Sequence, residues 1–508
     1  MGCSGVDTLM FLRYNACYRH CMHTYQYLKK NIHLCILAFA LLLQIALIVC
    51  RLVGTPSYGD WDSFQYVGWA CSHGQNLYVD CWDNKGPLVF FFSAIGMFGG
   101  EWSSVLFWGL SNCLFTLCLY GAFSRRYGCW RAAAAALFGS IALTLIDGGN
   151  TGNNAETPAV LLTGIGLLLF YRFDLERIGS TAFWQGAVTA ALFFTKATLV
   201  GFGFFYVLFL LFSQGKSIAQ LLRSILRFSL GVLFVLMIIA ASFGSLQNIE
   251  AMYDASIYYN AFEYHSGSFF VRNLIMNLYV TWPTFTIPAC FLVIVVARGV
   301  WRGEQKGLVL SLILWFLFEI VVSSKIDTFF VHYLAIATVA VIPLFLESEY
   351  QSYVSVFWVR WMAVTVSLIS LYWLSFILRV QIHNLIKTQS LNLPAQYACE
   401  NGLKGKRAAI FGMAGVCRVA RLSEIKVANI YVGSVGHYLQ TASASRRASI
   451  ANSATNALNS QSTMYVVSEG RLEHLPWADS SEWKKSTERW EIMKTIEGIC
   501  FYKRKSRR

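Results

Sequence analysis

Long apolar runs, separated by short polar connections, make up most of residues 1–378. An α-helix needs about 20 mostly apolar residues to cross the hydrocarbon core of a bilayer. The runs are close to this length, so the pattern predicts an all-α polytopic membrane protein with about 11 transmembrane helices. The predicted helices cover residues 32–53, 104–123, 131–147, 157–171, 181–195, 197–213, 228–244, 273–297, 307–323, 329–346 and 361–378.

One further apolar stretch, residues 86–99, is only about 14 residues long and too short to span comfortably. Counting it as a crossing would move Arg125, Arg126 and Arg131 to the outer face. That would oppose the rule that cytoplasmic connections are rich in Lys and Arg. We therefore predict a helix that lies in, or dips into, the outer leaflet.

The distribution of basic residues predicts the orientation. With residues 1–31 as a cytoplasmic segment, the inner connections hold 16 Lys and Arg and the short outer segments hold five. Those five are Arg51, Lys85, Lys196, Arg272 and Lys325. The apolar run from Ile32 is too long for a cleavable signal, and we expect it to serve as an uncleaved anchor. An odd number of crossings places the C-terminal segment outside.

Composition agrees with a membrane protein. Of the 508 residues, 56% are hydrophobic and 13% are charged, and the mean hydropathy is +0.49. These values exclude a soluble enzyme, a disordered chain and a secreted disulfide scaffold. Residues 379–508 carry 20 Lys and Arg against 9 Asp and Glu, which is most of the net charge of +14. Their basic end is expected to contact anionic lipid head groups, not nucleic acid.

The chain divides into three predicted parts: residues 1–31, the membrane domain 32–378 and an outer domain 379–508. In the outer domain, 407–412, 464–467 and 498–502 are predicted as strands and 480–494 as a helix, which indicates a small α/β domain. The Ser/Ala/Asn-rich insert 441–463 is interpreted as a flexible excursion. Cys71 and Cys81, both in the first outer segment, are the candidates for a disulfide in an oxidising compartment.

Charged residues gather in that first outer segment, residues 54–102. It contains Asp60, Asp62, Asp80, Asp83 and Lys85. From charge alone, a hydrated loop and a functional site are equally good interpretations. Asp60 would begin a helix, where a carboxylate is stabilised in its ionised form and can accept a proton. Lys85 precedes the short helix, whose free N–H groups would join the ammonium in binding an anion. A base and a phosphate-binding group on one loop suit glycosyl transfer.

These positions resemble the first outer loop of the GT-C class of membrane glycosyltransferases. The similarity is strongest to bacterial relatives of the dolichyl-phosphate-mannose protein mannosyltransferases and of the lipid A aminoarabinose transferase. The residues that carry it are Asp60, Tyr66, Gly68, Gly74, Tyr78, Asp80, Asp83, Lys85, Gly86, Pro87 and Leu88, with further similarity at residues 154–158, 195–196 and 330–333. Gly86 departs from the pattern, since many relatives have a proline there.

The resemblance implies roles for individual residues. Asp60 matches the catalytic base, and Asp62 is an alternative for that role. Glu156 matches an acidic position that orients the acceptor or holds a divalent cation, and Lys85 matches the lysine near the donor phosphate. Lys196, Lys325 and His332 are predicted at the same outer level and could complete the phosphate site. A divalent cation, with Asp60, Glu156 and His265 as candidate ligands, is a possible cofactor but is not implied.

The expected function is transfer of a monosaccharide, hexosyl or pentosyl, from a polyprenyl-phosphate donor to a glycan, lipid or protein acceptor, with inversion. It would take place on the outer face of the cytoplasmic (inner, plasma) membrane, as part of cell-envelope synthesis. The main alternative is a transporter or flippase for lipid-linked sugars, which would need similar halves and mid-membrane charges that the sequence does not show. A non-catalytic envelope assembly protein of the same fold is a third interpretation.

Overall fold

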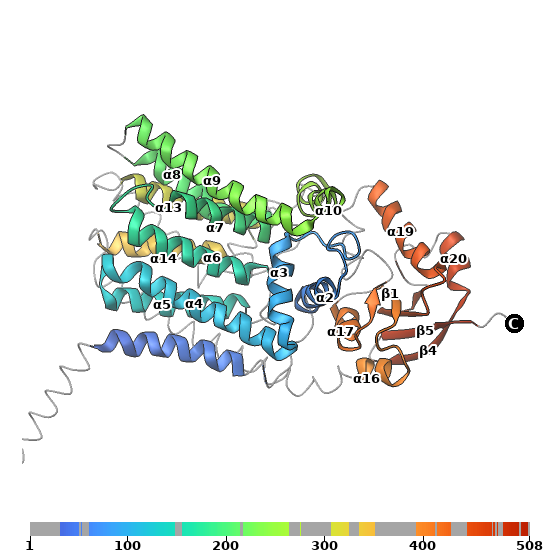
Figure 1. Ribbon diagram of the computed structural model, residues 1–508. Helices are drawn as coiled ribbons and strands as arrows, with labels where there is room; N and C mark the ends of the chain where they lie inside the picture. The colour runs from blue at the N-terminus through green and yellow to red at the C-terminus, as the bar shows by residue number, and fades with distance from the viewer. Residues whose placement is uncertain are drawn as a thin grey trace, which may run out of the picture.

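The chain was studied as a computed structural model. The residues it describes are 31–49, 52, 60–147, 155–213, 217–263, 275, 306–324, 335–350, 393–411, 414–427, 444–469, 471–472, 475, 481–496 and 499–505. They form a bundle of long helices and, beyond one end of the bundle, a domain with a β-sheet (Figure 1). The predicted helices 273–297 and 361–378 lie outside the described residues.

The bundle consists of long apolar helices. They are Asn31–Val49, α4 (Glu101–Tyr127), α5 (Cys129–Asp147), α6 (Glu156–Leu169), α7 (Ala182–Thr195), α8 (Gly201–Phe212), α9 (Ile218–Phe243), α13 (Lys306–Ser324) and α14 (Ala335–Tyr350). Among the described residues, four helices are long and apolar enough to cross a membrane: Asn31–Val49, Trp102–Tyr127, Glu156–Asp174 and Ile218–Phe243. Large buried aromatic side chains such as Phe115, Phe170 and Trp315 fill the bundle interior.

Most predicted helices agree with these bounds to within a few residues, but α9 begins ten residues before the predicted 228–244. A capping box explains the early start. The Ser217 hydroxyl accepts a hydrogen bond from the Gln220 backbone N–H at 3.3 Å, and the Gln220 side chain accepts one from the Ser217 N–H at 3.2 Å. These bonds satisfy N–H groups at the helix start, so the helix extends through its polar first turn.

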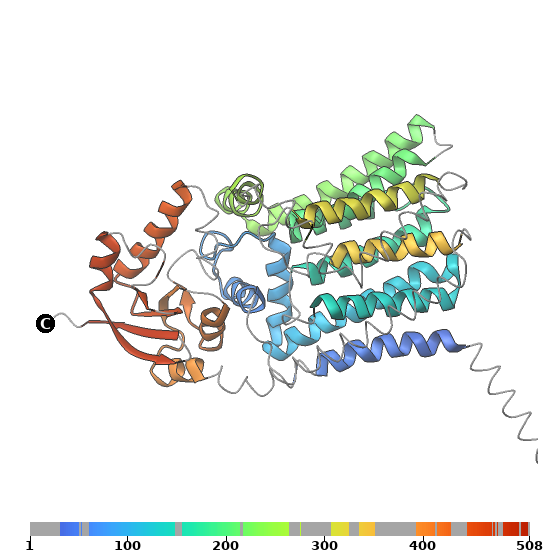
Figure 2. The ribbon, with the colours of Figure 1, turned by 180° about the vertical axis from the view of Figure 1, so that it is seen from behind.

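Two short helices lie at the end of the bundle that faces the sheet domain. Helix α2 (Asp60–Ser72) packs against α3 (Pro87–Gly96), which continues as a 3₁₀ turn to Gly99. Pro87 occupies the first turn of α3, where its missing N–H has no cost. Figures 1 and 2 show α3 running across the end of the bundle and not alongside its helices. The predicted short helix at residues 86–99 is confirmed, and its location in the outer leaflet stays a prediction.

The C-terminal part contains a five-stranded sheet of order β2-β1-β3-β5-β4. The strands are β1 (Arg407–Phe411), β2 (Lys426–Val427), β3 (Tyr465–Glu469), β4 (Trp490–Ile496) and β5 (Ile499–Arg504). β1 pairs in parallel with β2 and β3, whereas β5 pairs antiparallel with β3 and β4. The helices of this part are α16 (Leu393–Glu400), α17 (Ala414–Leu422), α19 (Ala444–Asn459) and α20 (Ser481–Thr487).

Two predictions for this part were wrong. Residues 444–459 of the supposed flexible insert form α19, because Ile450, Ala454 and Leu458 make a buried stripe at helical spacing. The predicted helix 480–494 ends at Thr487, since residues 490–496 pair with β5 as strand β4.

The sheet domain and the first outer segment share one hydrophobic core. A single buried cluster runs from Phe64 and Tyr78 to Phe411 and Trp483. The Tyr66 hydroxyl also donates a 3.2 Å hydrogen bond to the carbonyl of Ile425, directly before β2. The domain is therefore packed onto the end of the bundle and is not a loosely tethered module.

Candidate functional site

A buried ion pair joins two of the predicted site residues. Glu156 is the first residue of α6, where a carboxylate interacts favourably with the helix dipole. Lys196 directly follows α7 in an extended conformation. Its Nζ lies 2.5 Å from Glu156 Oε1, and the two side chains are only 12% and 5% exposed. Such a pair is expected only where the geometry is good, because burial of each charge is costly.

Lys85 reaches the same place through a close backbone contact. The Gly86 N–H donates a hydrogen bond of 3.1 Å to the carbonyl of Thr195. Lys85 directly precedes Gly86, and Lys196 directly follows Thr195. A Cβ on Gly86 would lie 2.0 Å from the Phe194 oxygen, so a side chain at this position would force the backbone apart. The structure thus places the backbone next to Lys85 against the backbone next to Lys196, although the two lysines are 111 positions apart in the sequence.

Neighbouring side chains hold Lys85. Its Nζ donates to Asn84 Oδ1 at 2.8 Å, and its backbone N–H donates to Asp83 Oδ1 at 3.0 Å. The Tyr78 hydroxyl donates to the Lys85 carbonyl at 2.6 Å. Tyr78 is buried with a φ of 66°, a strained conformation for a residue with a side chain. Burial, with a further contribution from Asp83, raises the pKa of Tyr78, so the hydroxyl stays protonated as a donor.

A second outer segment, residues 245–272, is rich in aromatic residues, and its length and composition predict a folded surface at the outer interface. Residues 246–263 form α10 (Leu246–Met252) and a π-helix, η4 (Tyr253–Glu263). Asn260 of η4 donates to the Asn84 carbonyl at 2.5 Å and accepts from Asn84 Nδ2 at 3.1 Å. No feature of the sequence around Asn260 signals this pairing, because π-helical turns are rare and carry no simple residue pattern.

The structure separates the two candidate bases. Asp62 is fully buried, and its Oδ1 lies 3.9 Å from Arg418 Nη1 and 3.6 Å from Arg421 Nη2, both on α17 of the sheet domain. It therefore forms part of the contact between α2 and the sheet domain, and its alternative role as the base stays a prediction. Asp60 is the first residue of α2, and its side chain lies outside the described atoms.

Positions 60 and 62 are separated by about 200° around α2, because an α-helix turns about 100° per residue.

The remaining candidates divide into those that the structure reassigns and those it does not describe. Lys325, His332, His265 and Arg272 lie outside the described residues. Glu263 pairs with Arg446 of α19, its Oε2 lying 2.7 Å from Nε. Within the described ranges, no group of three His, Cys, Asp or Glu side chains could hold a metal ion. The Glu156 carboxylate contacts an ammonium at 2.5 Å, a neighbour that does not fit a divalent cation on the same oxygen.

The predicted disulfide is not formed. Cys71 and Cys81 are both free thiols, and the buried Cys81 Sγ is directed at Gln75 Oε1 at 3.9 Å. Burial, together with the nearby Asp80 carboxylate, raises the pKa of Cys71 to about 12. Both thiols therefore act as packed, protonated side chains of the first outer segment.

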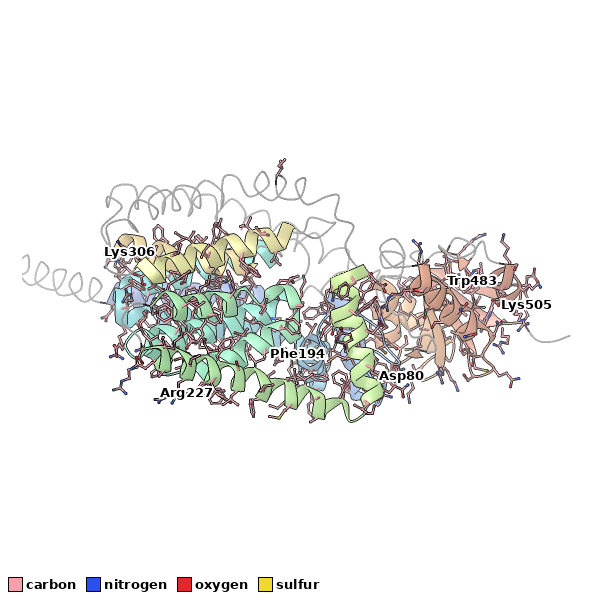
Figure 3. The ribbon with its side chains drawn as sticks, turned by 90° about the horizontal axis from the view of Figure 1, so that it is seen from above. Asp80, Phe194, Arg227, Lys306, Trp483 and Lys505 are labelled. Atoms are coloured by element: carbon pink, nitrogen blue, oxygen red, sulfur yellow. The ribbon has the colours of Figure 1, made fainter. Side chains whose placement is uncertain are left out.

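The side chains at the two ends of the bundle differ. Figure 3 shows Arg227 and Lys306 toward the end far from the sheet domain, while Phe194, next to the Gly86–Thr195 contact, lies toward the sheet domain. Basic residues Arg125 and Arg126 also end α4 at its last turn. The Lys85, Lys196 and Glu156 site is thus at the opposite end of the bundle from Arg227 and Lys306.

Comparisons with known proteins show what the sequence and the fold of this chain are similar to. Residues 84–243 match the family described as dolichyl-phosphate-mannose-protein mannosyltransferase. No curated protein matches the sequence. The fold is similar to that of ArnT from Cupriavidus metallidurans bound to undecaprenyl phosphate, with a TM-score of 0.58 and 12% identity over 92% of this chain and 97% of ArnT. The apo structure of ArnT gives a TM-score of 0.58 and 12% identity over 90% and 96% of the two chains. Residues 84–243 are thus similar in sequence to a family of membrane glycosyltransferases, and most of the chain is similar in fold to ArnT.

Proposed function

We propose that this protein transfers a monosaccharide from a polyprenyl-phosphate donor to an acceptor hydroxyl at the end of the bundle that carries the sheet domain. The observation that carries the proposal is the Gly86–Thr195 backbone hydrogen bond, which places the segment of Lys85 next to the segment of Lys196. Cations at the edge of an apolar bundle suit a phosphate whose prenyl chain extends into the bilayer. ArnT, which has the same fold, was crystallised with undecaprenyl phosphate.

The proposed site faces the outside of the cell. Arg227 and Lys306 lie toward the other end of the bundle, and positively charged ends of membrane helices are retained in the cytoplasm. In this proposal the sheet domain is extracytoplasmic and the protein lies in the plasma membrane. The acceptor is then a glycan, lipid or protein of the cell envelope.

The proposed chemistry requires a base and a positively charged site for the leaving group. Asp60 takes the proton from the acceptor hydroxyl as its oxygen bonds to the anomeric carbon. The bond from that carbon to the phosphate oxygen breaks, and the lysines stabilise the negative charge that develops on the polyprenyl phosphate. Attack opposite the phosphate inverts the anomeric centre. We extend the proposed phosphate site to Lys325 and His332, and no step is assigned to a metal ion.

Glu156 has a defined part in this proposal. In the structure its carboxylate accepts from Lys196 Nζ, so the ammonium is already ordered before any phosphate binds. A phosphate oxygen would compete with Glu156 for this donor, and the released carboxylate would then be available to orient the acceptor. Holding a cation in place before the reaction is the kind of preorganisation that lowers an electrostatic barrier.

The test compares the two aspartates of α2. Purified protein in lipid nanodiscs is supplied with radiolabelled hexosyl and pentosyl polyprenyl phosphates, with and without a chelator. We expect Asp60→Asn to lower transfer or hydrolysis by about 10²–10⁴-fold at unchanged thermal stability. Asp62→Asn should instead lower the melting temperature, because Arg418 and Arg421 lose their buried partner.

Two outcomes would overturn the proposal. The first is that no donor is consumed while lipid-linked sugar crosses the bilayer of reconstituted vesicles, which would identify a flippase. The second is that Asp60→Asn retains full activity while Asp62→Asn loses it at unchanged stability. Inhibition by the chelator, reversed by a divalent cation, would show that the charge on the phosphate is stabilised by a metal and not by the lysines alone.

A further inference from the structure

An arginine of the sheet domain is inserted into the outer segments of the membrane domain. Arg446, on α19, is 9% exposed. Its guanidinium carbon lies 5.6 Å from the centre of the Trp82 ring and 5.2 Å from that of Tyr259. These two rings contact each other edge-on at 5.2 Å. The guanidinium is therefore packed against aromatic faces from both outer segments, an environment that favours Arg over Lys.

Two carboxylates of η4 complete this contact. Arg446 Nη2 and Nη1 lie 2.8 and 2.9 Å from the two oxygens of Asp254, a bidentate arrangement. Arg446 Nε lies 2.7 Å from Glu263 Oε2. Asp254 and Glu263 are near the two ends of η4, so one side chain fixes the whole π-helix against the sheet domain.

A short series of contacts leads from this arginine to the proposed donor site. Tyr259, which packs on Arg446, is followed in η4 by Asn260. Asn260 makes reciprocal hydrogen bonds with Asn84, and Asn84 Oδ1 accepts from Lys85 Nζ at 2.8 Å. Trp82, on the other side of Arg446, is only three residues before Lys85. Both sides of the arginine are thus connected to the segment that carries the lysine.

We propose that Arg446 is a positioning residue for the donor site, which it serves by fixing η4 and residues 82–85 so that Lys85 is held where the phosphate binds. The proposal rests on the proposed function in assigning a phosphate to Lys85. It also gives the sheet domain a role in the reaction: α19 completes the donor site from outside the membrane domain. Arg446 itself touches no reacting atom in this assignment.

The experiment compares three variants of the full-length protein in lipid nanodiscs. Arg446→Ala removes the contact, and Arg446→Lys keeps the charge but not the planar, bidentate geometry. Arg447→Ala is the matched control, since Arg447 is the adjacent residue of α19 and is exposed. Amide hydrogen exchange of residues 76–86 reports the order of the Lys85 segment, and binding of undecaprenyl phosphate reports the phosphate site.

We expect Arg446→Ala to increase exchange in residues 76–86 and to weaken undecaprenyl phosphate binding about tenfold, the equivalent of losing one hydrogen bond to a charged group. Arg446→Lys should recover part of both effects, and Arg447→Ala should match the wild type. In transfer assays, the KM for the donor should rise more than kcat falls, because the ammonium is displaced and not removed.

The outcomes separate the two proposals. If Arg446→Ala increases exchange only in α19 and η4 and leaves residues 76–86 and the binding unchanged, the arginine merely docks the sheet domain and the positioning role is refuted. If exchange in 76–86 increases but wild-type protein does not bind undecaprenyl phosphate, the arginine orders the segment and the proposed function fails instead.

Discussion

The buried pair of Glu156 and Lys196 allows a quantitative test of the site geometry. The two side chains are 5% and 12% exposed and the charged atoms are 2.5 Å apart. Breaking a buried pair by removing one partner costs about 3–5 kcal/mol, because the other charge is left in a poorly solvating environment. Glu156→Gln and Lys196→Met keep the approximate side-chain size while removing one charge each.

The chain offers a matched control pair. Arg125 and Glu176 approach to 2.9 Å, but their side chains are 55% and 59% exposed. Water and salt screen such a pair, so it contributes only about 0–1 kcal/mol. Arg125→Met and Glu176→Gln, singly and together, repeat the same chemical changes at the surface of the bundle.

The assay is a double-mutant cycle for each pair, with the free energy of unfolding measured in mixed detergent micelles. We expect each single change at Glu156 or Lys196 to cost about 3–5 kcal/mol and the double variant to cost clearly less than their sum. The coupling energy should exceed about 2 kcal/mol for the buried pair and stay below about 1 kcal/mol for the exposed pair. A coupling energy that is the same for both pairs within about 0.5 kcal/mol would refute the reasoning.

Two further predictions concern the first outer segment. Gly86→Ala should lower stability by about 1–3 kcal/mol and weaken undecaprenyl phosphate binding, because its Cβ would meet the Phe194 carbonyl at 2.0 Å. The control Gly96→Ala should be tolerated, since the nearest atom to its Cβ would be 3.4 Å away. Melting curves and binding isotherms of the two variants test this, and equal behaviour of the two would contradict it. Since its pKa is raised to about 12, Cys71 should stay protonated below that pH and react with iodoacetamide at pH 8 far more slowly than the exposed Cys399. Denatured protein prepared without reductant should show free thiols at Cys71 and Cys81 by peptide mass spectrometry, and a peptide linked through both would refute the free-thiol assignment.

Features that depend on a short stretch of sequence were predicted well. The helices at 104–123, 131–147 and 181–195 correspond to α4, α5 and α7, since transfer of an apolar run from water to lipid is a local property. The short helix at 86–99 was also found from its length and the surrounding charges. The strand at 407–412 was found from its continuous apolar run, which β1 buries between two neighbouring strands.

Features that depend on contacts between residues far apart in the sequence were not predicted. The residues 444–459 look flexible by composition, yet they form α19 because Arg446, Ile450 and Leu458 are buried against other elements. Asp62 matched a catalytic position within one or two residues, and only its contacts with Arg418 and Arg421 show that it faces the sheet domain. The Cys71–Cys81 disulfide was inferred from compartment alone, which says nothing about how the two thiols are oriented.

The sequence by itself determined that this chain is a polytopic membrane protein, which residues are apolar enough to cross and which charged residues collect between the crossings. It did so because partitioning between water and lipid acts on each segment independently. The tertiary structure decided that Gly86, next to Lys85, bonds to Thr195, next to Lys196. It also decided that Glu156 holds Lys196 and that Arg446 joins the sheet domain to both outer segments. Glu156 and Lys196 are 40 positions apart in the sequence, and Arg446 and Trp82 are several hundred apart. Only the packing of the elements against one another brings such residues into contact.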